Sequence, residues 1–359
     1  MLPLVKVGLP DKEILMPRLE EVIYSGIIAE GQEVYAFEEE FSTLFGYSKS
    51  YAMSSGTACL HASLVLSGIE AGSEVITTSM TAEPTNLSIL YAGGIPVFAD
   101  VDGAGNICPK SVKNKISKNT KAIIVVHYAG YPAQLNALRE IADENGISLI
   151  EDCAHALGAT YNGMSIGAIG DFAIFSFQAI KHMTTIDGGM LISKKNLDEE
   201  IKRFRWFGML KGGDRTKMDI SKIGYKYNMT NVAAVIGRSQ LECISSRLNR
   251  HIDNGKYYDT KLSGIKGVEL VSLSEYANPS YWLYTLKVDD SEKLIDRLSS
   301  IGVQASKLHK PNHLHSIFNA SGISLPNLNK FYKNLVHIPC GWWVDDKARE
   351  AIVDCIVSN

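Results

Sequence analysis

The feature that most constrains the fold is an alternation of short apolar segments with longer amphipathic ones, which begins near residue 50. The apolar segments predict strands at residues 50–53, 74–78, 96–99, 121–126 and 147–151. The segments between them predict helices at residues 57–67, 83–92 and 135–145. Strands that are joined through helices pair in parallel. We therefore expect an α/β fold with a mostly parallel central sheet that is covered by helices on both faces.

The last third of the chain has a different order of elements. A turn-rich stretch at residues 208–224 precedes a helical pattern that starts near Thr230. Beyond it we expect a strand at residues 282–288, a helix at residues 292–301 and a closing helix from Asp345. This order predicts a smaller C-terminal α+β domain. We place the large domain at residues 1–240 and the small domain at residues 241–359.

Composition and charge exclude several classes of protein. A net charge of −3 over 359 residues provides no basic field for nucleic acid or an anionic membrane. The six cysteines are scattered without a CxxC pair, which favours reduced thiols in the cytoplasm over a disulfide framework or a zinc site. No apolar run reaches the length of a membrane span. We therefore expect a soluble cytoplasmic protein.

A lysine follows one further predicted strand. Residues 171–177 are rich in apolar and aromatic side chains and predict a short buried strand, and Lys181 lies just beyond it. If its ammonium enters an apolar pocket, desolvation lowers its pKa and frees an amine that forms an imine with a carbonyl. A surface lysine on a loop is the alternative that Lys181 by itself leaves open.

Two loops that follow predicted strands carry groups suited to an anion and to a cation. Residues 54–58 join a strand to a helix, where the helix N-terminus and small residues provide a site for a phosphate. Asp152 follows another strand, and its carboxylate can pair with a positively charged ring nitrogen. Ordinary helix capping explains each loop equally well when it is taken alone.

These features together predict one cofactor. An imine-forming lysine, a carboxylate for a heteroaromatic ring nitrogen and a helix N-terminus for a phosphate are the requirements of pyridoxal 5′-phosphate. A metal site made from His127, His155 and His182, which lie in loops after strands, is the competing hypothesis. Their spacing matches no recognised ligand pattern and no carboxylate pair accompanies them, so we expect no metal.

Several short motifs occur in a set order along nearly the whole chain. They are Ser25-Gly26, Gly31, Phe37-Glu38, residues 55–61, 93–100, 126–130 and 151–154, Phe175-Ser176-Phe177, Lys181, Gly188-Gly189 and residues 224–229. In this order they resemble the DegT-like sugar aminotransferases, a branch of the fold-type I pyridoxal phosphate enzymes that makes amino sugars from keto-sugar nucleotides. The resemblance implies the fold-type I architecture and an aminotransferase activity.

The resemblance also implies roles for individual residues. Lys181 is expected to form the imine and to move a proton between substrate and cofactor, and Asp152 to keep the pyridinium nitrogen protonated. His155 stands where the family usually has Gln, and we expect a hydrogen bond to the phenolic oxygen of the cofactor. The residues that we expect to hold the phosphate are Gly56, Thr57, Ala58 and Ser176.

Two other activities on this fold are alternatives. A related dehydratase branch replaces the lysine by histidine, and a non-catalytic regulator would bind the cofactor without turnover. Lys181, Asp152 and Ser176 are all present, so we expect the aminotransferase.

Ala82 and Lys226 also depart from the family pattern. Ala82 stands where an aromatic residue usually stacks on the cofactor ring, so this stacking is lost or comes from another residue such as His127 or Met80. Lys226 stands where an Asn often reaches the phosphate from the neighbouring subunit, and a lysine satisfies a phosphate as a point charge. The resemblance therefore implies a homodimer with shared active sites.

The substrate is less determined by the sequence. The cationic residues that we expect to meet substrate phosphates are Arg205, His309, Lys310 and His313, although each is explained equally well as a surface charge. They do not separate a keto-sugar nucleotide from a small phosphorylated ketone such as a triose phosphate. By resemblance we expect glutamate as the amino donor, and an amino sugar for a surface polysaccharide or glycoconjugate as the product.

Overall fold

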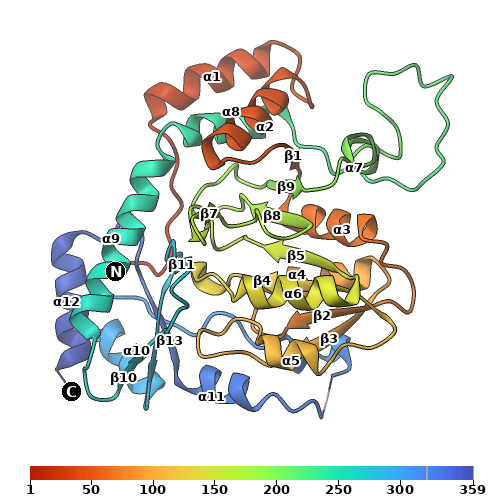
Figure 1. The fold of residues 1–359 in the computed structure, drawn as a ribbon. Helices are drawn as coiled ribbons and strands as arrows, with labels where there is room; N and C mark the ends of the chain where they lie inside the picture. Colours follow the sequence, from red (N-terminus) through yellow and green to blue (C-terminus); the bar gives the residue numbers. More distant parts are fainter. Residues whose placement is uncertain (321, 359) are drawn as a thin grey trace.

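A seven-stranded sheet forms the centre of the structure, a computed structural model that describes residues 1–320 and 322–358 (Figure 1). Its strands are β1 (Ser50–Met53), β2 (Glu74–Thr78), β3 (Ile95–Ala99), β4 (Thr120–Val126), β5 (Ser148–Asp152), β8 (Phe172–Ser176) and β9 (Gly189–Ser193). Their order in space is β1-β9-β8-β5-β4-β2-β3, and the strands from β8 to β3 are parallel. β9 pairs antiparallel with both β8 and β1. The expected mostly parallel α/β sheet is confirmed.

Helices cover both faces of this sheet. Because alternate residues of a strand point to opposite sides, each central strand contributes side chains to two cores. One core contains residues of α2 (Gln32–Phe45), α6 (Leu135–Asn145) and α8 (Asn231–Leu241). The other contains residues of α3 (Gly56–Leu66), α4 (Glu83–Tyr91) and α7 (Asp198–Phe204). In β4, Ile123 and Val125 belong to the first core, whereas Ile124 and Val126 belong to the second. The strand is apolar throughout because both of its faces are buried.

Local capping explains where two of these helices begin. The Ser55 hydroxyl accepts a hydrogen bond from the Ala58 N–H at 3.0 Å at the start of α3. The Thr230 hydroxyl accepts one from the Ala233 N–H at 3.2 Å at the start of α8, so the predicted start near Thr230 is confirmed. The turn-rich stretch at residues 208–224 forms part of the long loop between α7 and α8 that extends away from the body (Figure 1).

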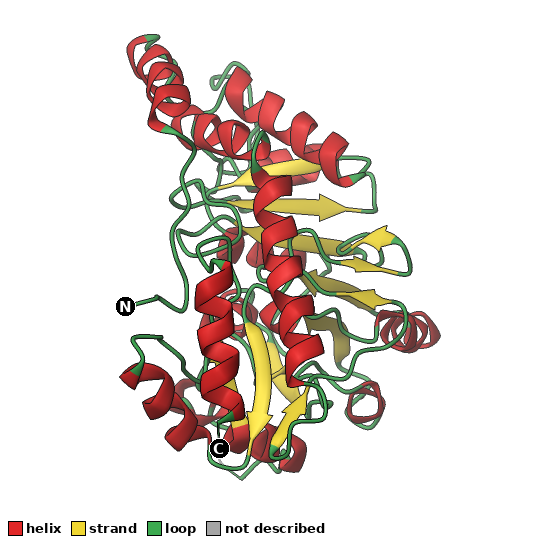
Figure 2. Ribbon diagram, turned by 90° about the vertical axis from the view of Figure 1, so that its left-hand side faces the viewer, coloured by secondary structure: helices red, strands yellow, loops and turns green. Residues whose placement is uncertain are grey.

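The C-terminal part of the chain forms a smaller α+β unit, as expected. Its antiparallel sheet has the order β10-β12-β13. The strands are β10 (Val268–Leu270), β12 (Tyr284–Val288) and β13 (Leu335–Ile338), and the helices are α9 (Ile244–Leu262), α10 (Ser291–Ser300), α11 (Pro326–Asn334) and α12 (Asp346–Val357). Long helices pack across this sheet (Figure 2). No helix of the described residues is long and apolar enough to cross a membrane.

Several contacts join the units besides the chain between α8 and α9. β11 (Ala277–Asn278) pairs with β6 (Thr160–Tyr161), which also pairs with β7 (Met164–Ser165). The first residues lie against the small unit: the Leu2 N–H donates to the Gly302 carbonyl at 2.7 Å, and Leu4 is part of the small unit's core. The helix that follows, α1 (Lys12–Tyr24), packs on α8 instead. The division at residues 240 and 241 falls at the end of α8 and remains a proposal.

Candidate active site

The carboxyl ends of the parallel strands and the loop after β8 surround a cavity of about 510 Å³. Residues that the sequence analysis proposed for the site come to it from separate segments. Those that line the cavity are Gly56, Thr57, Asp152, His155, Ser176, Lys181 and His309. The structure therefore brings together side chains that lie far apart in the sequence, at the edge of the sheet where α/β proteins bind ligands.

Lys181 lies in the loop between β8 and β9, and its amine faces this cavity. Burial lowers the pKa of Lys181 to about 8, although the negative charge of Asp152 opposes this shift. The amine lies 4.4 Å from the centre of the Trp282 ring. A lysine with such a pKa is partly neutral near pH 7 to 8, so its nitrogen is available as a nucleophile and as a base.

Asp152 ends β5 and is buried beside the same cavity. Its Oδ2 accepts a hydrogen bond from the Thr85 hydroxyl at 2.8 Å, and its Oδ1 accepts one from the Ala154 N–H at 3.1 Å. Burial raises the pKa of Asp152, and these two bonds and the Lys181 charge only partly offset the rise. Thr85 was not found from the sequence, because nothing in the first turn of α4 distinguishes this hydroxyl from others.

The N-terminus of α3 provides a cradle for an anion. The N–H groups of the first helical turn have no partner inside a helix, and Gly56 and Thr57 line the cavity there. A Cβ atom at Gly56 would lie 2.9 Å from the Ser176 Cβ, so glycine lets the helix end approach the Ser176 side chain. Ala58 does not line the cavity, and its N–H is already bound to the Ser55 hydroxyl. Of the three residues expected at this helix end, Gly56 and Thr57 line the cavity and Ala58 does not.

His155 is buried against an aromatic wall that the sequence analysis did not find. Its ring stacks on Trp282 with centroids 4.0 Å apart and planes inclined by 15°. Burial and the nearby Lys181 charge hold the pKa of His155 well below its usual value, so the ring is neutral. Its Nδ1 is buried and has no partner. A neutral imidazole with a free nitrogen suits a single hydrogen bond to a ligand oxygen.

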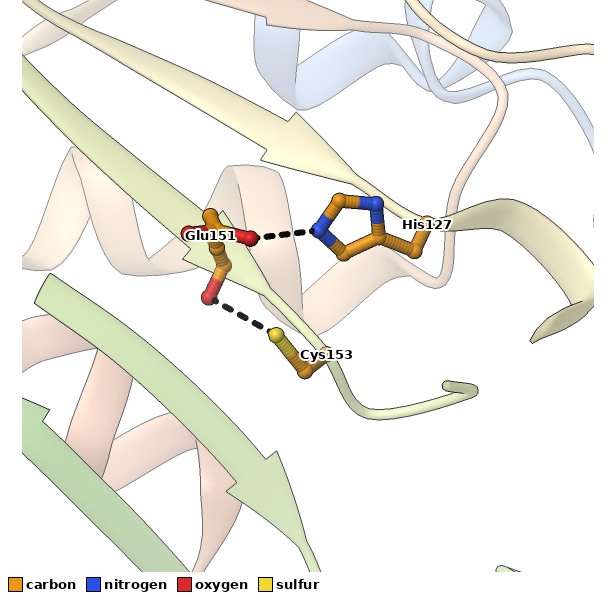
Figure 3. A group of neighbouring side chains, drawn as sticks. All are labelled: His127, Glu151 and Cys153. Carbon is orange, nitrogen blue, oxygen red and sulfur yellow. Dashed lines mark hydrogen bonds and ion pairs between the residues drawn. The ribbon is translucent and has the colours of Figure 1, made fainter. Parts of the chain in front are cut away.

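The cluster of His127, Glu151 and Cys153 places metal-ligand atom types close together (Figure 3). Its hydrogen bonds show that it is a structural cluster. Glu151 Oε2 accepts bonds from His127 Nε2 at 3.0 Å and from the Gly167 N–H at 2.9 Å. Glu151 Oε1 accepts bonds from the N–H groups of Ile169 and Gly170, and His127 Nδ1 accepts the Ala133 N–H at 3.1 Å. The carboxylate oxygens of Glu151 and the Nδ1 of His127 are therefore already engaged and are not free to bind a metal.

The other histidines of the competing metal hypothesis have different partners. The His182 ring packs on His251 at 4.6 Å, and its Nε2 bonds to the Ser280 carbonyl.

The structure also bears on which residue stacks on the cofactor ring. Neither His127 nor Met80 lines the cavity, whereas Ala82 does. The expectation that either residue replaces the usual aromatic side chain finds no support.

The expectation that Arg205 binds a substrate phosphate also finds no support. Its guanidinium is buried and pairs with Glu30 at 2.8 Å and Glu38 at 2.5 Å, and it donates to the Ala52 carbonyl. This ion-paired network joins the loop before α2, α2 itself and β1. Both carboxylates come from sequence positions far from Arg205, so its residue type alone suggested a role that its partners exclude.

The remaining cationic candidates differ in position. His309 lines the cavity, and its ring lies nearly parallel to His155 with centroids 5.9 Å apart. Lys310 is exposed and does not line the cavity. His313 also lies outside it, where its Nδ1 is 2.7 Å from the Ser79 hydroxyl. Lys226 is exposed outside the cavity of its own chain, with its amine 2.6 Å from Asn228 Oδ1 and 4.4 Å from the Trp206 ring centre.

A desolvated lysine, a buried aspartate and a helix N-terminus, the three groups that pyridoxal phosphate requires, lie together at one edge of the α/β sheet. Residues 11–357 match the model of the DegT/DnrJ/EryC1/StrS aminotransferase family. The chain belongs to this family, as the resemblance implied.

Named relatives agree with this assignment. The chain is 30% identical over 368 residues to GDP-perosamine synthase from Vibrio cholerae, covering 99% of this chain and 98% of that protein. Its structure is similar to the sugar aminotransferase CalS13 from Micromonospora echinospora, with a TM-score of 0.96, 34% identity and 100% of both chains covered. The aminotransferase Spr1654 from Streptococcus pneumoniae, solved in PLP and PMP forms, has a TM-score of 0.90 and 26% identity over 99% of this chain and 98% of its own in the PLP form. The protein is a pyridoxal phosphate-dependent aminotransferase.

Proposed function

We propose that this enzyme transfers an amino group from glutamate to a keto-sugar nucleotide and so makes an amino sugar. The names of its relatives, a GDP-perosamine synthase and a sugar aminotransferase, support this substrate class over the alternative of a small phosphorylated ketone. The observation that carries the proposal is the placement of Lys181 and Asp152 on one cavity beside the N-terminus of α3. That the product serves a surface polysaccharide or glycoconjugate stays a prediction.

The residues of the cavity fit the cofactor. When bound, pyridoxal phosphate supplies an aldehyde for imine exchange and a ring that takes up electrons. Asp152 accepts only two hydrogen bonds and has a raised pKa. A cationic ring nitrogen would supply the positive partner that this buried carboxylate lacks. The unpartnered Nδ1 of His155 suits the phenolic oxygen, and Gly56, Thr57 and Ser176 suit the phosphate.

Lys181 performs the proton transfers in this proposal. Because its pKa is about 8, the amine both accepts and releases a proton near neutral pH without a large energetic cost. It would take a proton from the carbon of the donor that carries nitrogen, and in the second half-reaction it would return a proton to the acceptor carbon. Asp152 would assist by keeping a proton on the ring nitrogen, and its burial would strengthen that ion pair.

We propose that His309 contacts the substrate as a neutral hydrogen-bonding group. Burial, together with the Lys181 charge, lowers the pKa of His309 to about 4, so it carries no charge for a phosphate at neutral pH. Its Nε2 is buried without a partner. Among the described residues that line the cavity, it alone comes from the small unit. A sugar hydroxyl, which both donates and accepts hydrogen bonds, suits this nitrogen better than a phosphate does.

We also propose a homodimer in which Lys226 serves the partner's cofactor phosphate. Lys226 is exposed on the long loop and lies outside its own cavity. Large apolar side chains are exposed at Tyr24, Ile27 and Ile223 (84%, 63% and 78%), which is the kind of surface that a subunit interface covers.

Sedimentation measurements would test the dimer. Mixing Lys181→Ala with Lys226→Ala subunits would test site sharing, because one intact site should form in each mixed dimer. Location in the cytoplasm stays a prediction.

Two half-reactions test the proposed function. Glutamate should convert the loaded enzyme to its aminated form, which is followed through the visible absorbance of the cofactor. The aminated enzyme is then mixed in single turnovers with nucleotide-linked keto-sugars or with phosphorylated short ketones. Faster recovery of the absorbance with the keto-sugars supports the proposal. A response to the short ketones alone would contradict the proposed substrate class and leave the aminotransferase assignment intact.

A further inference from the structure

Trp282 makes three contacts with the groups that surround the catalytic lysine. The Lys181 amine lies 4.4 Å from the centre of its ring, and the His155 ring stacks on it at 4.0 Å. The indole Nε1–H donates a hydrogen bond of 3.0 Å to the carbonyl of Ile180, the residue before Lys181. Trp282 thus binds the backbone, the amine and the neighbouring imidazole of this site through one rigid ring.

The backbone of Trp282 is itself firmly placed. The turn at residues 128–130 holds both of its sides: the Ser280 N–H donates to the Gly130 carbonyl at 3.0 Å, and the Leu283 N–H to the Ala129 carbonyl at 3.3 Å. Gly130 has a φ of +95°, and a Cβ atom there would lie 2.6 Å from the backbone nitrogen of Trp282. Glycine is therefore required for this approach. The indole is buried in the core of the small unit, which leaves it little freedom to move.

We propose that Trp282 is a positioning residue that holds the Lys181 amine at the cavity while the amine is not bonded to the cofactor. Transamination releases this amine and later requires it back at the same place. A long, flexible lysine side chain would otherwise sample many rotamers in that interval. The aromatic face packs against the end of the Lys181 side chain whether the amine is charged or neutral, and its stacking with His155 holds the face in place beside the amine.

Other groups also act on the Lys181 charge. The Asp152 carboxylate favours the ammonium, whereas His155, His182 and His309 face it as neutral imidazoles whose protonation Lys181 disfavours. A test of positioning must therefore separate the place of the amine from its charge. Once the pH lies above the inflection measured for each variant the amine is neutral, so rates measured on that plateau report placement.

The experiment compares Trp282→Leu, which removes the aromatic face, with Trp282→Phe, which keeps a face and loses the Nε1–H donor. Two rates are measured: capture of pyridoxal phosphate by the apoenzyme on the high-pH plateau, and the single-turnover glutamate half-reaction of the loaded enzyme. We expect Trp282→Leu to lower both rates by about 10- to 100-fold with the KM for glutamate changed by less than about threefold. Trp282→Phe should recover most of the loss. If the Leu variant does not fold, Trp282→Met replaces it.

Trp343→Leu is the matched control. Trp343 is also an indole of the small unit that packs on a histidine, with its ring 5.8 Å from His251, and its Nε1 donates to the Pro3 carbonyl at 2.9 Å. This change should lower thermal stability and leave both rates unaltered. The proposal is overturned if Trp282→Leu keeps wild-type rates, or if Trp282→Phe is as slow as Trp282→Leu. The test uses glutamate alone, so its outcome is independent of which keto substrate the enzyme accepts.

Discussion

Glu151 and Asp152 are consecutive residues of β5 and both are buried, yet they have opposite characters. Glu151 points to the face that α6 covers, and four N–H groups saturate its two oxygens. Burial would raise the pKa of Glu151, but the hydrogen bonds from His127 and from the backbone donors bring it below its usual value. Asp152 points to the other face, accepts hydrogen bonds from two donors and has a raised pKa.

The difference teaches that burial by itself does not identify a functional carboxylate. A carboxylate has about four acceptor sites. Where the chain fills all of them, the group is part of the architecture, as in the cluster of His127 and Glu151. Where the chain leaves sites open toward a cavity, the buried charge is stabilised only when a ligand supplies the missing positive partner. The following predictions test this contrast.

The largest effect is expected on the cavity side, from Lys181→Ala. Removing the amine should lower the rate of the glutamate half-reaction by at least about 10⁴-fold, because both the imine bond and the proton carrier are lost. Lys310→Ala is the control, since this exposed lysine does not line the cavity. The half-reaction should be followed by absorbance. Substantial turnover in Lys181→Ala would mean that another residue holds the cofactor.

Asp152→Asn should lower the half-reaction rate by about 10³-fold, because a neutral amide does not keep the ring nitrogen protonated. The apoenzyme should be equally stable or more stable, because the variant no longer buries a charge with only two donors. Thermal unfolding of the apoenzyme measures the second effect. Near-normal activity would show that the wrong carboxylate has been assigned to the ring.

Glu151→Gln should produce the reverse pattern. The amide cannot accept from all four donors with the strength of a carboxylate, so the free energy of unfolding should fall by about 3 kcal/mol. Activity per folded molecule should change by less than about threefold, since Glu151 does not line the cavity. Denaturant unfolding and the half-reaction measure the two quantities. A catalytic loss without a loss of stability would break the contrast between the two carboxylates.

The pH dependence of the apoenzyme should sharpen the contrast. The pKa of Lys181 is lowered from 10.5 to about 8, so the neutral amine falls about tenfold for each pH unit below 8 and is nearly constant above it. The rate of pyridoxal phosphate capture should follow this curve. Asp152→Asn should move the inflection to lower pH, because it removes the charge that favours the ammonium, and Glu151→Gln should leave it in place. An inflection near 10.5 in the wild type would mean that the amine is hydrated.

The smallest effect is expected from Thr85→Val. This change removes the donor to Asp152 Oδ2, so the pKa of Asp152 should rise further and the carboxylate should be less well oriented. A loss of about fivefold in the half-reaction corresponds to one hydrogen bond of about 1 kcal/mol. Thr85→Ser keeps the hydroxyl and should restore the rate. A loss in Thr85→Ser together with an unchanged rate in Thr85→Val would show that the methyl group, not the hydrogen bond, is important.

The central sheet could be predicted from the sequence because its strands are buried on both faces. The predicted strand at residues 50–53 matches β1, and that at residues 121–126 lies within β4. The antiparallel β9 was not predicted, because its short apolar run contains no information about direction. The helices α1 and α2 were not assigned either. They pack largely on other helices, so their apolar residues do not follow the strand–helix alternation.

Within the site, Lys181 and Asp152 could be placed because each follows a strand whose carboxyl end reaches the same edge of the sheet. Thr85 and Trp282 could not be placed, since their contacts arise only when α4 and the small unit dock. Arg205 shows the converse. Its charge suggested a ligand, and its actual partners, Glu30 and Glu38, are brought to it only by tertiary folding.

The attachment of the first residues to the small unit has a consequence for synthesis on the ribosome. Leu2 bonds to Gly302 and Gln304, which emerge from the ribosome long after it. Every strand of the central sheet has been made once β9 has been translated, so strand pairing can begin while translation continues. The segment around Leu2 therefore stays unpaired until residues 302–304 have been made. This contact between the two units forms after the strands of the sheet are available, which is a built-in delay.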